Sequence, residues 1–145
     1  MTQLSEPAAP RLEFVYEAVA EVGTPIELGS APDGERRIVP IVGEGLIRGP
    51  RISGRLLADA ADWQVTRSDG VTVVDATYGL LLEDGTVVQV RNRGLRHASV
   101  DEVYFRTTPV FTAPAGPHEW MNRSVFVCSG TRAVDGIRLR VYRVL

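Results

Sequence analysis

Residues 62–93 read DWQVTRSDGVTVVDATYGLLLEDGTVVQVRNR, three runs of alternating residues separated by Asp69-Gly70 and Asp84-Gly85. Alternation with a period of two is typical of β-strands that bury one face. An Asp-Gly pair between two such runs indicates a β-hairpin, because a two-residue type I′ loop needs φ > 0 at both central positions. The stretch therefore predicts two consecutive antiparallel hairpins.

A two-residue loop at each Asp-Gly pair would set the register of both hairpins. It places Tyr78 opposite Arg91 and Trp63 opposite Ala76. One continuous face then carries Trp63, Val65, Val74, Ala76, Tyr78, Leu80, Leu82, Val87, Gln89, Arg91 and Arg93. The other carries Gln64, Thr66, Val73, Asp75, Thr77, Gly79, Leu81, Val88, Val90 and Asn92. The first face holds more large apolar groups, so we expect it to line the interior, although a one-residue slip would invert part of it.

Alternation continues along the rest of the chain. From residue 12 to 22, one face is expected to carry Leu12, Phe14, Tyr16, Ala18, Ala20 and Val22. Other strand-like runs lie near 35–42, 46–57, 62–68, 71–82, 86–93, 103–112, 119–131 and 137–144, with turn signals between them. Evenly spaced short strands predict a sandwich or a barrel, and adjacent hairpins favour an all-β, antiparallel up-and-down β-barrel. We expect a flexible N-terminal tail over residues 1–10 and a single β-barrel domain over residues 11–145.

Composition narrows the classes of protein. The 145 residues are 44% hydrophobic and 23% charged, with a formal net charge of −2, as in ordinary soluble domains. No basic run suggests nucleic-acid binding, and no apolar stretch approaches the roughly 20 residues of a membrane helix. Residues 1–10 lack the features of a signal peptide, and the lone Cys128 excludes an internal disulfide. These observations favour a cytoplasmic protein.

Several short motifs, taken in order, resemble the family called domain of unknown function 3237 (DUF3237, also UPF0311). The matching stretches are Arg36-Arg37-Ile-Val-Pro-Ile, Gly49-Pro50-Arg51-Ile-Ser-Gly54, Ala61-Asp62-Trp63, Asp69-Gly70, Asp75-Ala-Thr-Tyr78, Asp84-Gly85, Val90-Arg91-Asn92-Arg93-Gly94, Phe105-Arg106-Thr107-Thr-Pro109-Val-Phe111, Trp120-Met-Asn122-Arg123 and Val141-Tyr142. The resemblance implies a closed barrel of about eight to ten strands with a central cavity, and no established reaction. The chain departs from the family pattern at Leu57-Ala58-Asp59-Ala60, where the family tends to have a Pro-Gly-Gly-type turn.

The predicted interior face supplies the first candidate site. Polar groups that point into an apolar barrel are costly unless they are paired or meet a ligand. Tyr78 and Arg91 are the candidate catalytic residues: Tyr78 would donate to a carbonyl oxygen, and Arg91 would lower the phenol pKa and stabilise an oxyanion. Trp63 and Gln89 are candidate ligand-binding residues. The alternative is a buried Tyr–Arg pair that closes the core, or an outward-facing, salt-bridged surface.

Trp120 and Asn122 share a face by alternation and are also candidate ligand-binding residues. The resemblance adds weight to both, because they belong to its Trp-x-Asn-Arg stretch. The alternative is that Trp120 closes one barrel end and Asn122 caps a turn.

No metal ligands or cofactor motifs stand out in the sequence. His97 and His118 are isolated, Cys128 stands alone, and no phosphate-binding glycine loop or dinucleotide fingerprint occurs. We therefore expect neither a metal nor a cofactor.

The resulting hypothesis is a β-barrel that binds an apolar carbonyl-type small molecule, with cofactor-free isomerisation, cyclisation, elimination or lyase chemistry. The alternative is a non-catalytic small-molecule binding or carrier protein. A catalytic barrel needs a base near the ligand, for which Glu44, Asp62, Asp75 and the two histidines are candidates. The expected partner is a small-molecule ligand, without nucleic acid or membrane, and a homo-oligomer is compatible with the sequence.

Overall fold

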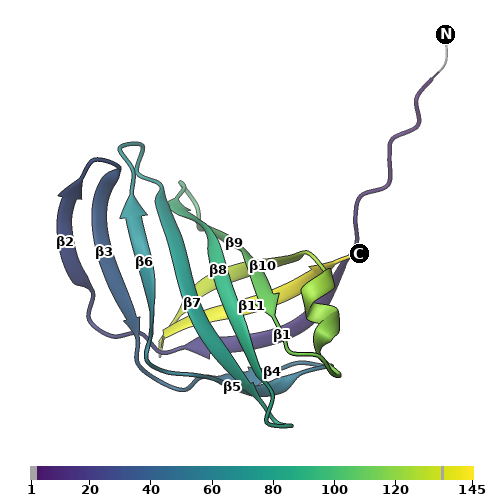
Figure 1. Ribbon diagram of the computed structural model, residues 1–145. Coiled ribbons are helices and arrows are strands. Elements are labelled where there is room, and N and C mark those ends of the chain that lie inside the picture. The colour runs from purple at the N-terminus through teal and green to yellow at the C-terminus, as the bar shows by residue number, and fades with distance from the viewer. Residues whose placement is uncertain (1–2, 135) are drawn as a thin grey trace.

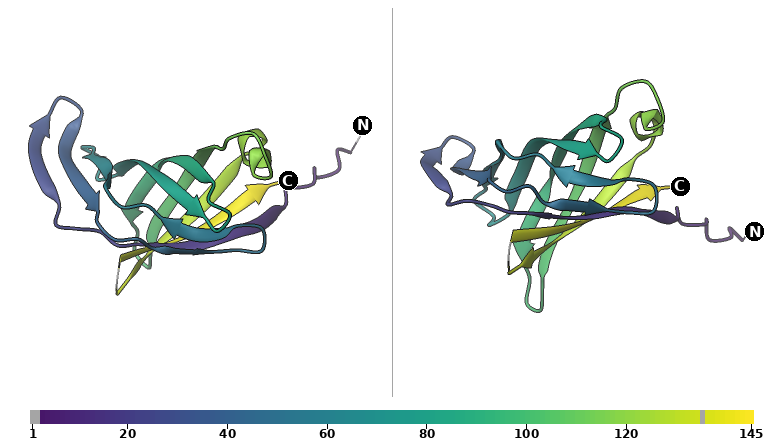
Figure 2. Two further views of the ribbon diagram at one scale, coloured as in Figure 1. Left: turned by 60° about the horizontal axis from the view of Figure 1, so that its bottom comes forward. Right: turned by 90° about the horizontal axis from the view of Figure 1, so that it is seen from below.

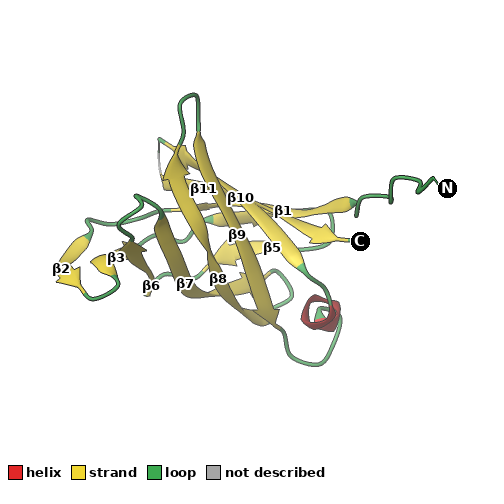
Figure 3. Ribbon diagram, turned by 90° about the horizontal axis from the view of Figure 1, so that it is seen from above, coloured by secondary structure: helices red, strands yellow, loops and turns green. Residues whose placement is uncertain are grey.

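The computed structural model describes residues 3–134 and 136–145, and these fold almost entirely into strands (Figures 1 and 3). The strands are β1 (Leu12–Ala20), β2 (Ile26–Ala31), β3 (Gly34–Ile41), β4 (Leu46–Arg48), β5 (Ser53–Leu56), β6 (Ala60–Thr66), β7 (Thr72–Leu82), β8 (Val87–Ala98), β9 (Val103–Thr112), β10 (Phe126–Ala133) and β11 (Gly136–Val144). A short 3₁₀-helix, η1 (Glu119–Arg123), precedes β10. Over these residues, no helix is long and apolar enough to cross a membrane.

Eight of the strands in the described residues close into an antiparallel barrel, as predicted. The order around the barrel is β7-β8-β9-β10-β11-β1-β4-β5, and β5 returns to β7. The first strand pairs with the last, Ala18 opposite Leu139, so the two ends of the barrel domain are joined in the sheet. Closure leaves these strands without a free edge.

Strands β2, β3 and β6 form an extension of the same sheet at one end of the barrel. Strand β7 pairs with β6 over Thr72–Thr77 and with β5 over Leu80–Leu82, so two strands share one of its edges. Strand β6 then pairs with β3, and β3 with β2. The three strands project away from the barrel body in Figure 1, and the other views show the same projection (Figure 2). Strand β2 lies outside the runs of alternating residues that predict the other strands.

The chain changes direction between β5 and β6 at Asp59. Its φ is +62°, the only positive value of a non-glycine residue among those described. Aspartate tolerates this left-handed conformation better than most residues, and glycine adopts it freely. Asp59 lies in the segment 57–60, where the chain departs from the Pro-Gly-Gly-type turn of the family pattern. It adopts a backbone conformation that suits the glycines of that pattern.

The predicted register of both hairpins is wrong by one residue. Each loop has three residues: Gly70 N donates to Arg67 O, and Gly85 N donates to Leu82 O. The glycines have φ of +83° and +87°, which fits a type I turn followed by a left-handed glycine. The extra loop residue shifts the pairing, so that Tyr78 lies opposite Val90.

The register shift reverses the faces of β6 and β8, while β7 faces as predicted. Val74, Ala76, Tyr78, Leu80 and Leu82 point inward on β7, together with Gln64 on β6 and Val88, Val90 and Asn92 on β8. The outer face instead carries Trp63, Val87, Gln89, Arg91 and Arg93. One added loop residue therefore exchanges the interior and exterior side chains of a whole strand.

A β-bulge in β1 interrupts the alternation that the sequence predicts for residues 12–22. Phe14 pairs with Tyr142 and Tyr16 with Val141, which leaves Val15 as an extra residue. Val15 and Tyr16 are both buried, whereas Phe14 is 38% exposed and packs on Tyr142 at the outside. Alternation holds without interruption in β9, where Phe105, Thr107, Pro109 and Phe111 all face inward and are buried.

The loop geometry predicts that Gly85→Val lowers the free energy of unfolding by about 1–2 kcal/mol, because a left-handed residue with a Cβ costs that much. A β-branched residue is the least tolerant of such φ values. Glu83→Val is the matched control, since Glu83 is an exposed residue of the same loop without a positive φ. Chemical denaturation of both variants measures the difference. Equal midpoints would contradict the three-residue loop.

Candidate functional site

A cavity of about 320 Å³ lies at the end of the barrel next to β3 and β6, which contribute to its lining. It lies inside the size range of small-molecule pockets. Its apolar wall comes from five strands and the β1–β2 connection: Ala20, Val22, Pro25, Val39, Ile41, Val74, Ala76, Phe105, Ile137 and Leu139. Its polar lining is Arg37, Asp62, Gln64, Tyr78, Asn92, Arg96, Thr107 and Arg132. Alternation brings these groups together, because each lies on an inward-facing position of its strand.

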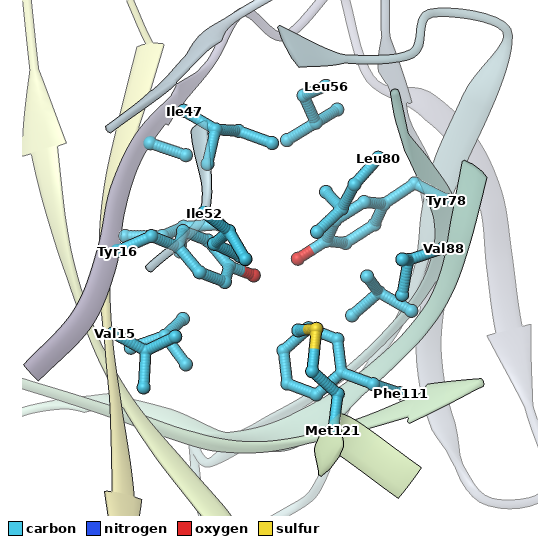
Figure 4. Close-up of a cluster of buried hydrophobic side chains, with 14 of the residues drawn as sticks. Val15, Tyr16, Ile47, Ile52, Leu56, Tyr78, Leu80, Val88, Phe111 and Met121 are labelled. Carbon is cyan, nitrogen blue, oxygen red and sulfur yellow. The ribbon is translucent and has the colours of Figure 1, made fainter. Parts of the chain in front are cut away.

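Three polar atoms of the cavity lining are buried and have no hydrogen-bond partner among the described residues. They are the Tyr78 hydroxyl, Asn92 Oδ1 and Thr107 Oγ1. The hydroxyl of Tyr16 is also buried without a hydrogen-bond partner among the described residues, and it points toward Tyr78 in the barrel interior (Figure 4). A buried polar group without a partner costs about 1–3 kcal/mol, so native proteins rarely leave several together.

A chain of hydrogen-bonded side chains also lines the cavity. Arg37 Nε donates to Gln64 Oε1 at 2.8 Å, and Gln64 Nε2 donates to Asp62 Oδ2 at 2.7 Å. The other carboxylate oxygen, Asp62 Oδ1, accepts from the Asp75 backbone N at 2.8 Å. Arg96 Nη2 also donates to Gln64 Oε1, at 3.3 Å. The two arginines fix the orientation of the amide, and the amide fixes the carboxylate.

Burial shifts the acidity of several groups around the cavity. It raises the pKa of the Asp62 carboxyl above its ordinary 3.8, against the opposing hydrogen bond from Gln64. Burial also raises the pKa of Tyr78, with a smaller contribution from Cys128, whereas the neighbouring Asn92 and Tyr16 lower it; the phenol stays protonated at neutral pH. The buried Cys128 thiol has its pKa raised to about 11 by burial, which keeps it protonated at neutral pH.

Of the six site residues predicted from the sequence, Tyr78 lines the cavity. The predicted contact between Tyr78 and Arg91 is wrong, because Arg91 lies on the outer surface and pairs with Asp75 at 3.2 Å. Gln89 is exposed on the same outer face. Trp63 is 52% exposed on the outer side of β6. The two-residue loops predicted from the sequence would have placed Trp63, Gln89 and Arg91 in the interior.

The other two predicted residues, Trp120 and Asn122, lie in η1 and not on a strand. Trp120 packs on Phe126, and the Arg51 guanidinium stacks 3.7 Å from its ring centroid. Asn122 Oδ1 accepts from Ala113 N, and its Nδ2 donates to Ala113 O. Phe126 and the cavity residue Ile137 lie at opposite ends of the β10–β11 pairing, so the structure does not bring η1 to the cavity.

The sequence contained a signal for one of the residues that were missed. In the row Val88, Val90 and Asn92, two apolar residues are followed by a polar one, and this row belongs to the face that the sequence assigned to solvent. Asp62 was named as a base but could not be placed. Among the described residues, no three His, Cys, Asp or Glu side chains cluster as metal ligands.

The chain is similar over nearly all of its length to a family described as "Protein of unknown function (DUF3237)", whose model matches residues 10–144. A UPF0311 protein of Rhodopseudomonas palustris is 33% identical, over 94% of this chain and 99% of the relative. The solved structure of a protein of unknown function from that species is 31% identical, with a TM-score of 0.88, over 96% of this chain and 100% of the other.

Two further solved structures share the fold. A "beta-barrel like protein" of Acinetobacter baumannii is 28% identical, with a TM-score of 0.88, and the match covers 98% of this chain and 100% of the other. An enzyme from Penicillium herquei is 18% identical, with a TM-score of 0.79, over 99% of this chain and 100% of the other. At that identity the second likeness concerns the fold alone.

Proposed function

We propose that this chain, which belongs to the DUF3237 family, binds an apolar carbonyl compound in the cavity and moves a proton on it without a cofactor. The reaction class would be isomerisation, cyclisation, elimination or a lyase step. The fold does not decide this, since one barrel architecture serves many functions. The proposal rests on the cavity lining.

The observation that carries the proposal is the set of buried polar atoms without partners. Tyr78, Asn92 and Thr107 direct such atoms to the lining of a cavity that also has an extensive apolar wall. A ligand that combines an apolar body with an oxygen atom would bury the walls and give the Tyr78 hydroxyl an acceptor. Apolar walls with a few convergent polar groups are the usual character of small-molecule sites.

Asp62 supplies the proton-transfer group that the hypothesis needs. Its carboxylate lines the same cavity as Tyr78 and is held by Gln64 and the Asp75 backbone. It would take a proton from the carbon next to the carbonyl, leaving the electron pair as an enolate. The neutral Tyr78 hydroxyl would stabilise the enolate oxygen, and the proton on Asp62 would return to a carbon of the ligand.

Tyr78→Phe tests the binding proposal, with 2-acetonaphthone as the test compound and calorimetric titration as the measurement. We expect affinity to fall about fivefold, the equivalent of one hydrogen bond of about 1 kcal/mol. The melting temperature should stay level or rise, because the hydroxyl has no partner among the described residues. Tyr104→Phe is the matched control, since Tyr104 is 45% exposed and stacks on His97. Lower stability with unchanged affinity would return Tyr78 to a purely structural role.

A further inference from the structure

Positive charge gathers where the cavity meets a second recess at the rim of the barrel. This outer recess is lined by residues of the β6–β7 loop, the β8–β9 hairpin and the β10–β11 hairpin, among them Gly70, Ala98 and Thr131. Arg37, Arg96 and Arg132 line both the cavity and the recess. A ligand that extended from one into the other would pass these three side chains.

Arg37 and Arg96 converge on one neutral acceptor. Both donate to Gln64 Oε1, Arg37 at 2.8 Å and Arg96 at 3.3 Å. No carboxylate of the described residues lies within 4.0 Å of either guanidinium group, in contrast to Arg91, which pairs with Asp75. Two cations that share one amide oxygen repel each other, and the repulsion is stronger when the groups are partly withdrawn from water.

The surroundings of Arg96 hold it in place. Its guanidinium group lies 5.8 Å from the centroid of the Phe105 ring, which lines both the cavity and the recess. Burial and the charge of Arg37 lower the pKa of Arg96, whereas Asp62 raises it. The group remains a cation at neutral pH, because an arginine pKa begins far above that range. An anion beside Arg37 and Arg96 would relieve the repulsion between their two positive charges.

We propose that the ligand is an organic anion, whose carboxylate or other oxyanion is held by Arg37 and Arg96 while its apolar, carbonyl-bearing part lies in the cavity. Each guanidinium has five N–H donors in a planar fork, and each donates one hydrogen bond within the described side chains. A group with two or more acceptor oxygens matches such forks. The inference rests on the proposed binding function. It adds that the ligand is negatively charged and that its anionic end lies at Arg37 and Arg96.

The experiment compares three ligands of one shape: 2-naphthoate, 2-acetonaphthone and 2-naphthyl phosphate, each titrated calorimetrically into the wild-type protein. We expect 2-naphthoate to bind about tenfold more tightly than the ketone, because its carboxylate would accept charge-assisted hydrogen bonds from the arginines. The phosphate separates the two oxyanions, since tighter binding than 2-naphthoate would identify a phosphate ester as the preferred class. Raising the salt concentration should weaken both anions and leave the ketone unchanged.

Arg96→Met is the decisive variant, because methionine keeps the apolar stem and removes the charge. We expect it to abolish the preference for the anions while the affinity for 2-acetonaphthone changes less than about twofold. Arg91→Met is the matched control on the outer surface of the same strand. If Arg96→Met fails to fold, Arg37→Met and the salt series of the wild type give the same test.

Each result has a distinct meaning. Equal affinity of the wild type for the anions and the ketone, or an equal loss of all three on Arg96→Met, would overturn the anion inference. Ketone binding that depends on Tyr78 would leave the proposed function standing in that case. Absence of binding by all three compounds would contradict both proposals together.

Discussion

Asp62→Asn should reduce proton exchange at the carbon next to the carbonyl of 2-acetonaphthone by about 10²-fold or more, the usual contribution of a general base. Asparagine has the shape of aspartate, so the acceptor for the Asp75 backbone N can remain, while the group can no longer accept a proton. The measurement is loss of the methyl signal in D₂O by nuclear magnetic resonance, with and without protein.

The pH dependence gives an independent check on the same residue. Burial raises the pKa of Asp62 above its ordinary 3.8, and only the ionised carboxylate can act as a base. The exchange rate should therefore rise with pH through a value above 3.8 and then level off. Because the pKa of Asp62 is higher in the folded protein than in the unfolded chain, the protonated carboxyl stabilises the fold relative to the ionised one. This contribution to the free energy of unfolding is fully present below pH 3.8 and is lost as the pH rises through the folded-state pKa.

Asp75→Asn is the matched control, because Asp75 is a neighbouring carboxylate that pairs with Arg91 and Arg93 on the outer face. It should leave exchange unchanged. If Asp62→Asn exchanges protons as fast as the wild type, Asp62 is not the base. If the wild-type protein binds the ketone without accelerating exchange at any pH, the carrier alternative holds in place of the enzyme.

Leu80→Ala should lower the free energy of unfolding by about 2–5 kcal/mol, the range measured for fully buried leucines. The Leu80 side chain is 0% exposed and packs in the barrel core beside Tyr78 and Val88 (Figure 4). Its loss leaves a void that the closed sheet can only partly fill. For a domain of this size, the melting temperature should fall by about 2–4 °C per kcal/mol.

Leu81→Ala is the control, with the same change at the next residue of the same strand. Leu81 is only partly buried and faces outward, so we expect a loss below about 1 kcal/mol. Denaturant titrations of both variants decide the point. A similar loss at Leu80 and Leu81 would mean that β7 does not separate an interior from an exterior at these residues.

Local alternation was sufficient to predict β7 and β9. Every second residue of a strand faces the same side, so Tyr78 and Leu80 belong together whatever the strand pairs with. The same alternation holds in β9, whose Phe105 and Phe111 share a face and lie in the core, 9% and 4% exposed. The order of strands and turn signals predicted the closed antiparallel barrel, because each hairpin leaves its strands adjacent.

Alternation alone could not say which residues share a face across two strands. That depends on the number of residues in each loop, and an Asp-Gly pair fits both a two-residue loop and the three-residue loop that the structure contains. The two choices differ by one residue, which moved Arg91 outward and Asn92 inward. The energy that selects between them comes from burying the apolar residues of the whole strand, such as Val88 and Val90.

The amino-acid sequence by itself determined the fold class, the family and the inward direction of Tyr78. Tertiary structure alone decided the site, since Arg37, Asp62 and Arg96 come from three strands and meet through Gln64. Their separation along the chain gives no local signal of contact. Only the pairing of β3 with β6, and the closure of the barrel beneath them, brings these charges to one cavity, because a strand controls the direction of its own side chains and not the identity of the strands that face them.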